Sequence, residues 1–573
     1  MRASGAPMPP ALASFRRPRL DRTTAHVCVC AFLLQCKPSE PHLVPYLMDV
    51  KGFSSAQVEA DILPVSVYAS LVFFLLAGPA ASGTSTKAVL VAGGACKLLT
   101  RVLLLWGRTL GAMRLMQVAF AAGAASDLML YAYLAETAPR DADLDGVRDA
   151  PASESGGGAE GASPASFGSD APSAGSRVRF ATGAASASAM LGYMLAAELG
   201  QIAFERGASY DSLFVASLIT VALGCVGLAS LPGDGKATSP NASPKTTTRQ
   251  NAALADVRAT SRDGDPGGGP AASATTVKKR PRNTSSSSSS VREKVIRAVV
   301  AASESCYGSS AAIALSAWWV LGTPPASALE NYVLSVLNDV EADAGGRDAG
   351  GHVAFFARAA SAAAALAAAR AHPKVAAAPE TYAAASAATA ACAAVFSTST
   401  SVVAASVAYA LAVACVHGVS VLVFAQTSLC AAAARSAMRS RGAGYAEMED
   451  AAEEGDVLSG PFARAPPSRD LEGISPPRTG ERRDDGGGAE GLLFGLNGAF
   501  ALVVLVITQA SVDASRGGAR GAAAAAAVLA ALAAGAVVAI AAARRVALGA
   551  EWALAPAPSD VSYAWLARLL LAE

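Results

Sequence analysis

The sequence has few charged residues. Asp, Glu, Lys and Arg together make up 16% of its 573 residues, whereas a soluble domain has about 25%. Hydrophobic residues make up 52%, and the mean hydropathy is +0.36. This composition disfavours a water-soluble enzyme. The net charge of +1, without a basic face on any helix, also argues against a nucleic acid as partner.

The common motifs of enzymes and metal sites are absent from the sequence. It contains no H-E-x-x-H, no G-x-x-x-x-G-K-[ST], no G-x-G-x-x-G after a strand and no nucleophile elbow. The nine cysteines occur mostly singly inside apolar runs, and the pair Cys28 and Cys30 has no second pair to complete a zinc site. We therefore expect no enzyme activity, no metal and no cofactor. The missing phosphate loop also argues against an ATP-driven pump.

Apolar stretches long enough to cross a membrane recur along the chain. A spanning helix needs about 20 apolar residues, because each residue rises about 1.5 Å and the hydrocarbon core is about 30 Å thick. This spacing predicts an all-α membrane protein with about twelve transmembrane helices in two six-helix bundles. The expected spans are 25–48, 60–81, 87–106, 111–136, 178–204, 210–231, 309–337, 352–371, 379–397, 401–433, 491–512 and 519–547.

Polar, low-complexity segments separate some of these spans. They are rich in Gly, Ser, Pro and charge, and bury too little apolar surface to offset the entropy of ordering. We expect a cytoplasmic loop at 138–176, a disordered cytoplasmic linker at 232–291 and a cytoplasmic insertion at 436–489. The other predicted units are a cytoplasmic tail at 1–24, an N-terminal bundle at 25–231, a C-terminal bundle at 292–547 that begins with an amphipathic helix at 292–305, and a C-terminal tail at 548–573.

Basic residues suggest how the chain is oriented. Arg19 and Arg22 precede the first span, and a basic run occupies 278–282 in the central linker. Cytoplasmic loops carry an excess of Lys and Arg, so we expect both termini in the cytoplasm and an integral protein of the plasma membrane. A lipid-binding segment or a nuclear localisation patch is the alternative interpretation of the basic run.

A proline-rich break interrupts the first expected span. The chain reads C-K-P-S-E-P-H-L-V-P-Y-L from Cys36 to Leu47, and its prolines remove helix hydrogen bonds. Glu40 places a carboxylate at the break, where an ionisable group at membrane depth marks a functional site. This stretch resembles the reduced folate carrier and thiamine transporter family, which has a similar Pro-Ser-Glu-Pro break followed by Pro-Tyr-Leu.

Further matches to this family occur in order along the chain. The fifth span ends in Leu-Gly-Gln at Gln201, the seventh contains the pair Trp318 and Trp319, and the eleventh reads L-L-F-G-L-N up to Asn497. The resemblance implies a major-facilitator architecture, in which two six-helix bundles rock around a site near the membrane midplane. It also implies a vitamin as cargo.

The charge of a few span residues distinguishes the two branches of the family. Asp127 stands where folate carriers have a basic residue and thiamine transporters an acidic one. Val413 and Leu505 stand where folate carriers have cations. The resemblance thus implies thiamine or a related organic cation. Departures from the family pattern, such as Ser66 in place of an aromatic residue and Arg358 in place of an acid, weaken the assignment of one particular vitamin.

Two acidic residues are the main candidates for the site. Asp127 and Glu40 would form a cation-binding pair, because a carboxylate in hydrocarbon is costly without a partner or a cavity. The alternative is a structural salt bridge from either acid to Lys97, Arg101 or Arg358.

Three further residues complete the predicted substrate site. Asn331 matches the thiamine-transporter pattern, Gln426 matches the tenth span of the family, and Tyr131 either stacks on cargo or packs helices. We leave Trp318 and Trp319 out, because tryptophans near a membrane face are commonly interface anchors.

The predicted function is secondary-active transport of a small-molecule vitamin through a lipid bilayer, by alternating access, with a coupling proton or counter-anion. A carrier of folate or another organic anion is one alternative, with Arg101 or Arg358 in place of the missing cations. A membrane receptor or scaffold that does not transport is the other.

Overall fold

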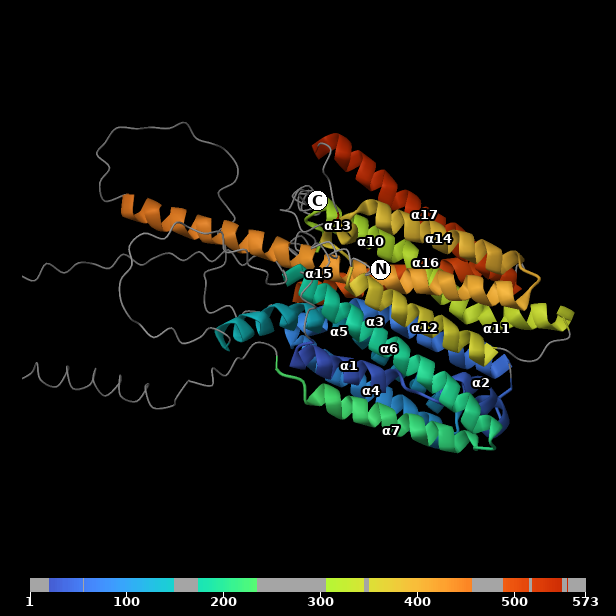
Figure 1. Ribbon diagram of the computed structural model, residues 1–573. Helices are drawn as coiled ribbons and strands as arrows, with labels where there is room; N and C mark the ends of the chain where they lie inside the picture. The colour runs from blue at the N-terminus through green and yellow to red at the C-terminus, as the bar shows by residue number, and fades with distance from the viewer. Residues whose placement is uncertain are drawn as a thin grey trace, which may run out of the picture.

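The computed structural model describes residues 20–54, 56–148, 174–233, 306–344, 350–455, 488–514, 518–548 and 554. Within these ranges all regular secondary structure is helical. The helices lie side by side along one direction, with the blue-to-green first half of the chain packed against the yellow-to-red second half (Figure 1). This arrangement confirms the predicted all-α fold of two bundles.

The first half of the chain forms the N-terminal bundle. Its first span is broken, and the next five are long helices. These elements are α1 (Arg22–Gln35), η2 (Glu40–His42), α2 (Leu43–Pro45), η3 (Tyr46–Val50), η4 (Gln57–Ile62), α3 (Leu63–Gly83), α4 (Thr86–Trp106), α5 (Leu110–Arg148), α6 (Ala174–Glu205) and α7 (Tyr210–Ala229).

The break in the first span lies where the prolines predict it. Helix α1 ends at Gln35, and the chain resumes as a short 3₁₀ turn at Glu40. Side chains of α7 satisfy the backbone groups that the break leaves without helix partners: Ser217 Oγ accepts from Ser39 N at 3.0 Å, and Thr220 Oγ1 donates to Cys36 O at 2.6 Å. These bonds allow irregular backbone inside a membrane bundle.

The second half forms the C-terminal bundle. Its first span is also broken, because α10 ends at Gly322 and α11 begins at Pro324. The elements are α10 (Ser310–Gly322), α11 (Pro324–Ala344), α12 (Gly350–Ala369), α13 (Pro373–Ala377), α14 (Pro379–Thr398), α15 (Val402–Gly455), α16 (Gly488–Ala514) and α17 (Gly518–Leu548).

Nine of the described helices are long and apolar enough to cross a membrane. The chain is thus an integral membrane protein. Three of the expected spans do not form a single helix that is both long and apolar enough. The spans at 25–48 and 309–337 are each divided by prolines into shorter pieces, and α14 is rich in alanine, which is only weakly apolar.

Two helices run further into the polar segments than the sequence suggested. Helix α5 continues to Arg148 and α15 to Gly455, so the predicted loop at 138–176 and the insertion at 436–489 both begin as helix. The α15 extension contains many Ala, Arg, Glu and Met, which are strong helix formers. The α5 extension contains Pro139 and Gly146, so helix propensity does not account for it. Of the expected linker at 232–291, residues 234–291 lie outside the described residues, and so does the expected amphipathic helix at 292–305.

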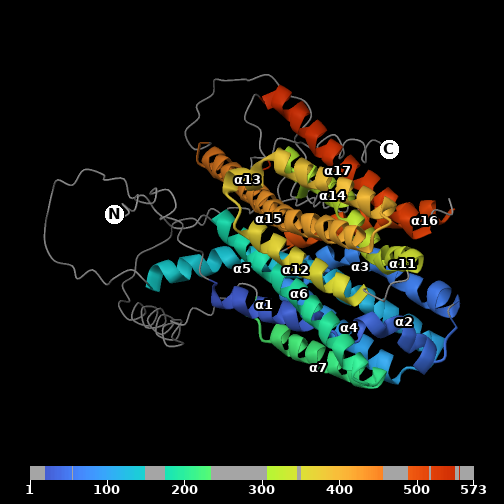
Figure 2. The same ribbon diagram turned by 45° about the vertical axis from the view of Figure 1, so that its right-hand side comes forward.

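The two bundles pack closely near the end of the molecule where α1 begins, which we call the closed end. There, a Cβ placed on Gly183 of α6 would lie 2.4 Å from Ala369 Cβ of α12, and one on Gly78 of α3 would lie 2.3 Å from Leu492 Cα of α16. Further along, α3 and α16 leave an apolar cavity of about 140 Å³ beside Tyr68. Figure 2 shows α6 and α12 side by side at this contact between the bundles.

Candidate functional site

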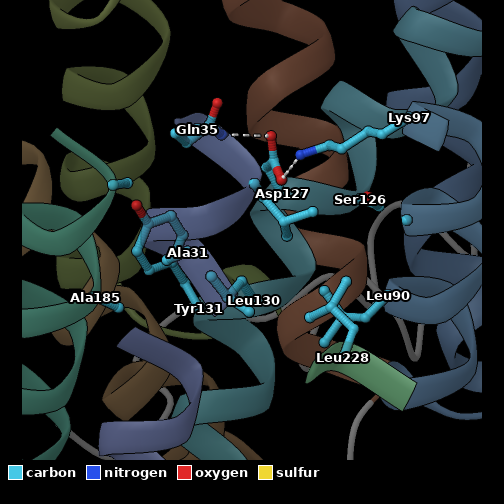
Figure 3. A pocket seen from close by; sticks show the side chains of 13 residues that line it. Ala31, Gln35, Leu90, Lys97, Ser126, Asp127, Leu130, Tyr131, Ala185 and Leu228 are labelled. Carbon is cyan, nitrogen blue, oxygen red and sulfur yellow. Dashed lines mark hydrogen bonds and ion pairs between the residues drawn. The ribbon is translucent and has the colours of Figure 1, made fainter. Parts of the chain in front are cut away.

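A small cavity lies inside the N-terminal bundle, next to Asp127 (Figure 3). Its volume is about 40 Å³, which is room for a few water molecules, whereas drug-sized ligands occupy about 300 Å³ or more. A drug-sized ligand would therefore fit here only if the surrounding side chains or helices moved. The lining comes from α1, α4, α5, α6 and α7 and consists of Ala31, Leu34, Gln35, Leu90, Gly94, Lys97, Ser126, Asp127, Leu130, Tyr131, Ala185, Ala189 and Leu228.

Asp127 has a polar partner on each carboxylate oxygen. Lys97 of α4 forms an ion pair with Oδ1, and Gln35 Nε2 of α1 donates to Oδ2 at 3.3 Å. The Asp127 side chain is still 39% exposed, whereas that of Lys97 is 13% exposed. The carboxylate thus remains accessible while its counter-ion is largely buried.

Glu40 lies in a second ionic cluster at the break of the first span. Its Oε2 accepts from Arg101 Nη2 at 2.8 Å, and Lys37 Nζ lies 3.5 Å from Oε1. Arg101 Nη1 also lies 3.5 Å from Ser39 Oγ. One carboxylate thus lies next to two basic side chains, so the basic groups of this cluster outnumber the acidic ones.

A third ionic cluster lies in the C-terminal bundle. Arg358 Nη1 of α12 donates to Glu330 Oε1 of α11 at 2.9 Å, and His417 Nε2 of α15 lies 3.9 Å from the same oxygen. The Tyr193 ring lies between this cluster and the Glu40 cluster of the N-terminal bundle. Lys37 Nζ lies 5.2 Å from the ring centroid and Arg358 Cζ lies 5.0 Å from it, which are cation–π distances.

Aromatic side chains join the bundles beside the cavity. Tyr131 of α5 packs against Phe424 of α15 at 4.7 Å between centroids, and Trp319 contacts both Phe424 and Phe494. Trp318 is also buried, and its Nε1 donates to Ser386 Oγ at 2.7 Å. The two tryptophans therefore belong to the core, and their interpretation as interface anchors was wrong.

The structure brings only part of the predicted substrate site together. Asp127 and Tyr131 line the same cavity. Glu40 belongs to the separate cluster at the break. Asn331 is exposed on α11, and Gln426 is buried on α15, where its Oε1 accepts no hydrogen bond from the described residues. The ion pairs considered as the alternative for Asp127 and Glu40 are both present.

Several residues of these clusters were not singled out from the sequence. Gln35, Lys37, Tyr193 and His417 each lie in or beside an apolar run. A polar or ionisable residue inside a span is a functional candidate by default, and this signal would have identified Lys37 and His417. Nothing in the sequence distinguishes Tyr193 from a tyrosine that packs helices.

Comparison with known proteins agrees with this architecture. The family model of the reduced folate carrier matches residues 20–142 and 173–432. Thiamine transporter 2 of Homo sapiens is 30% identical over 112 residues, which are 19% of this chain and 23% of that protein. Thiamine transporter 1 of Mus musculus is 29% identical over 112 residues, which are 19% of this chain and 22% of that protein.

A solved structure shows the same fold. The major facilitator superfamily proton:xylose symporter XylE, bound to 6-bromo-6-deoxy-D-glucose, matches with a TM-score of 0.51 and 10% identity. The alignment covers 93% of this chain and 96% of that one. The two-bundle structure is thus of the major-facilitator type. Since the family model matches more than half of the sequence, the chain belongs to the reduced folate carrier family.

Proposed function

We propose that this protein is a secondary-active carrier that moves thiamine or a related organic cation by alternating access. The observation that carries this proposal is the accessible carboxylate of Asp127 at the cavity, with Gln35 on its second oxygen. An organic cation needs such a carboxylate, because charge in a low-dielectric site is stable only with a counter-charge. The relatives named as thiamine transporters add support.

The remaining predicted residues have supporting roles in this proposal. Tyr131 offers a ring at the same cavity. Glu40 holds Arg101 and Lys37 at the break. Asn331 and Gln426 would reach cargo only after the bundles move, and Gln426 Oε1 accepts no hydrogen bond within the described part of the chain.

Uptake by the variant Asp127→Asn tests the proposal. With purified protein in vesicles, labelled thiamine should enter the wild type saturably, and Asp127→Asn should weaken its apparent affinity about thirtyfold or more. Glu205→Gln is the matched control, because it neutralises an exposed carboxylate of the same bundle that accepts a hydrogen bond from Gln201 and lies away from the cavity. Unchanged affinity in Asp127→Asn would refute the cation site.

A carrier of folate or another organic anion is the second candidate. The three ionic clusters contain the cations Lys37, Lys97, Arg101 and Arg358 but only the carboxylates Glu40, Asp127 and Glu330. This excess favours an anion near Tyr193. Saturable folate uptake that survives Asp127→Asn and is lost in Arg358→Met would select this candidate. Vesicles that bind cargo without counterflow would instead indicate a receptor.

We also propose that the closed end faces the cytoplasm of a cell whose plasma membrane holds the protein. Helix α1 begins at this end, and the extensions of α5 and α15 leave the bundles there (Figure 1). Epitope tags placed at 150–170, 240–270 and 460–480 should be labelled only after the cells are permeabilised. Labelling of any one tag on intact cells would contradict this orientation.

A further inference from the structure

Gly123 leaves room for the side chain of Lys97 to reach Asp127. A Cβ on Gly123 of α5 would lie only 2.6 Å from Lys97 Cγ, so the lysine stem rests directly on the glycine. Gly123 precedes Asp127 by four residues, which is one helical turn on the same face. The absence of a side chain at residue 123 therefore lets the ammonium group of α4 reach the carboxylate of α5.

The contact between Lys97 and Asp127 is asymmetric. The Asp127 side chain is three times as exposed as that of Lys97, 39% against 13%, and Gln35 donates to the other carboxylate oxygen. A purely structural pair needs no accessible carboxylate beside a water-sized cavity. The flexible four-carbon stem of lysine can withdraw from the carboxylate without moving a helix.

We propose that Lys97 is a tethered counter-ion, which occupies the Asp127 cation site in the empty carrier and is displaced by cationic cargo. This inference rests on the proposed function, since it requires that cargo be a cation. Asp127 is then neutralised in both states, first by Lys97 and then by the cargo. A neutral or anionic molecule cannot take the place of the ammonium group, so Lys97 also selects for positive charge.

A tethered counter-ion affects exchange and net uptake differently. Exchange of cargo for cargo uses only the loaded carrier, in which the cargo neutralises Asp127. Net uptake also requires the empty carrier to return, and without Lys97 it would return with an unpaired carboxylate at high desolvation cost. A purely structural ion pair would change both processes together.

The experiment compares Lys97→Met with the wild type in vesicles, with labelled thiamine as the probe. Counterflow into vesicles preloaded with thiamine should persist, with an apparent affinity about five- to tenfold tighter because the competing ammonium is gone. Net uptake into vesicles without internal thiamine should fall about tenfold or more relative to counterflow. Lys97→Arg keeps a cation, so its ratio of net uptake to counterflow should be closer to that of the wild type.

Gly123→Ala is a second variant that retains every charge. Its added methyl group would displace the Lys97 stem, so it should shift the ratio of net uptake to counterflow in the same direction as Lys97→Met. Equal losses of both processes in Lys97→Met, or no change in either, would overturn the tethered counter-ion but not the proposed function. A wild type that neither takes up nor exchanges thiamine would overturn the proposed function, and this inference with it.

Discussion

Glu40 and Arg101 form an ion pair of 2.8 Å that fastens the break of the first span to α4. Because Glu40 also faces Lys37, Glu40→Gln leaves two buried cations without a carboxylate. We expect this variant to lose about 3 kcal/mol in the free energy of unfolding. Thermal unfolding in detergent measures the loss. Uptake should fall in proportion to the amount of folded protein.

The double variant Glu40→Gln and Arg101→Gln is the control for this prediction. It removes both partners, so it should recover about 1 kcal/mol or more relative to the sum of the single variants. Strict additivity would mean that the two side chains do not stabilise one another.

The hydroxyl groups of α7 should hold the broken backbone of the first span. Ser217→Ala removes the acceptor for Ser39 N, and Thr220→Val removes the donor to Cys36 O. Each change should lower stability by about 1–2 kcal/mol, because a buried backbone group loses its partner. Ser212→Ala, an exposed position of the same helix, should stay within about 0.5 kcal/mol of the wild type.

Gly183→Ala should loosen the closed end. The new methyl group would lie 2.4 Å from Ala369 Cβ and 2.9 Å from Ala365 O, so α6 and α12 must separate, at a cost of about 1–3 kcal/mol. Leu429 of α15 lies 3.1 Å from a Cβ placed on Gly175 of α6, so the buried thiol of the next residue, Cys430, should then react faster with a maleimide. Gly535→Ala is the matched control, since no atom lies within 4 Å of its added Cβ. Equal rates in the two variants would refute the prediction.

Arg179→Met should make the protein more stable. Arg179 of α6 is 3% exposed, and its Nε has no hydrogen-bond partner in the described structure. A buried guanidinium that forms no ion pair among the described residues is costly, so an apolar side chain of similar length should raise the free energy of unfolding by about 1–4 kcal/mol. Thermal unfolding tests this, with the exposed Arg206→Met as the neutral comparison. A less stable Arg179→Met would show that the guanidinium is favourable where it lies.

The sequence predicted the bundles and the break in the first span, because hydropathy and proline act locally along the chain. It did not predict the break before Pro324, since the surrounding residues are as apolar as those of a continuous span. Nor did it place Trp318 and Trp319 in the core. Their burial depends on Ser386 and Phe424, which lie far away in the sequence.

The ionic clusters were only partly predictable. Lys97, Arg101 and Arg358 were all possible partners for Asp127 and Glu40, and the choice depends on how α4 packs against α1 and α5. The pairs Lys97 with Asp127 and Arg101 with Glu40 follow from that packing. Arg358 instead finds Glu330 in its own bundle, and periodicity within one helix carries no information about neighbouring helices.

Under the proposed alternating access, helix α15 would make the motion of the bundles measurable outside the membrane. Its span ends near Ala434, yet the helix continues to Gly455, which adds a rod of about 30 Å at 1.5 Å per residue. A rod fixed at its base is a lever, so a small tilt of the C-terminal bundle becomes a much larger sideways displacement at the tip. If the bundles rock as proposed, a fluorophore at the tip would report each step as a change in position, without any label near the cargo.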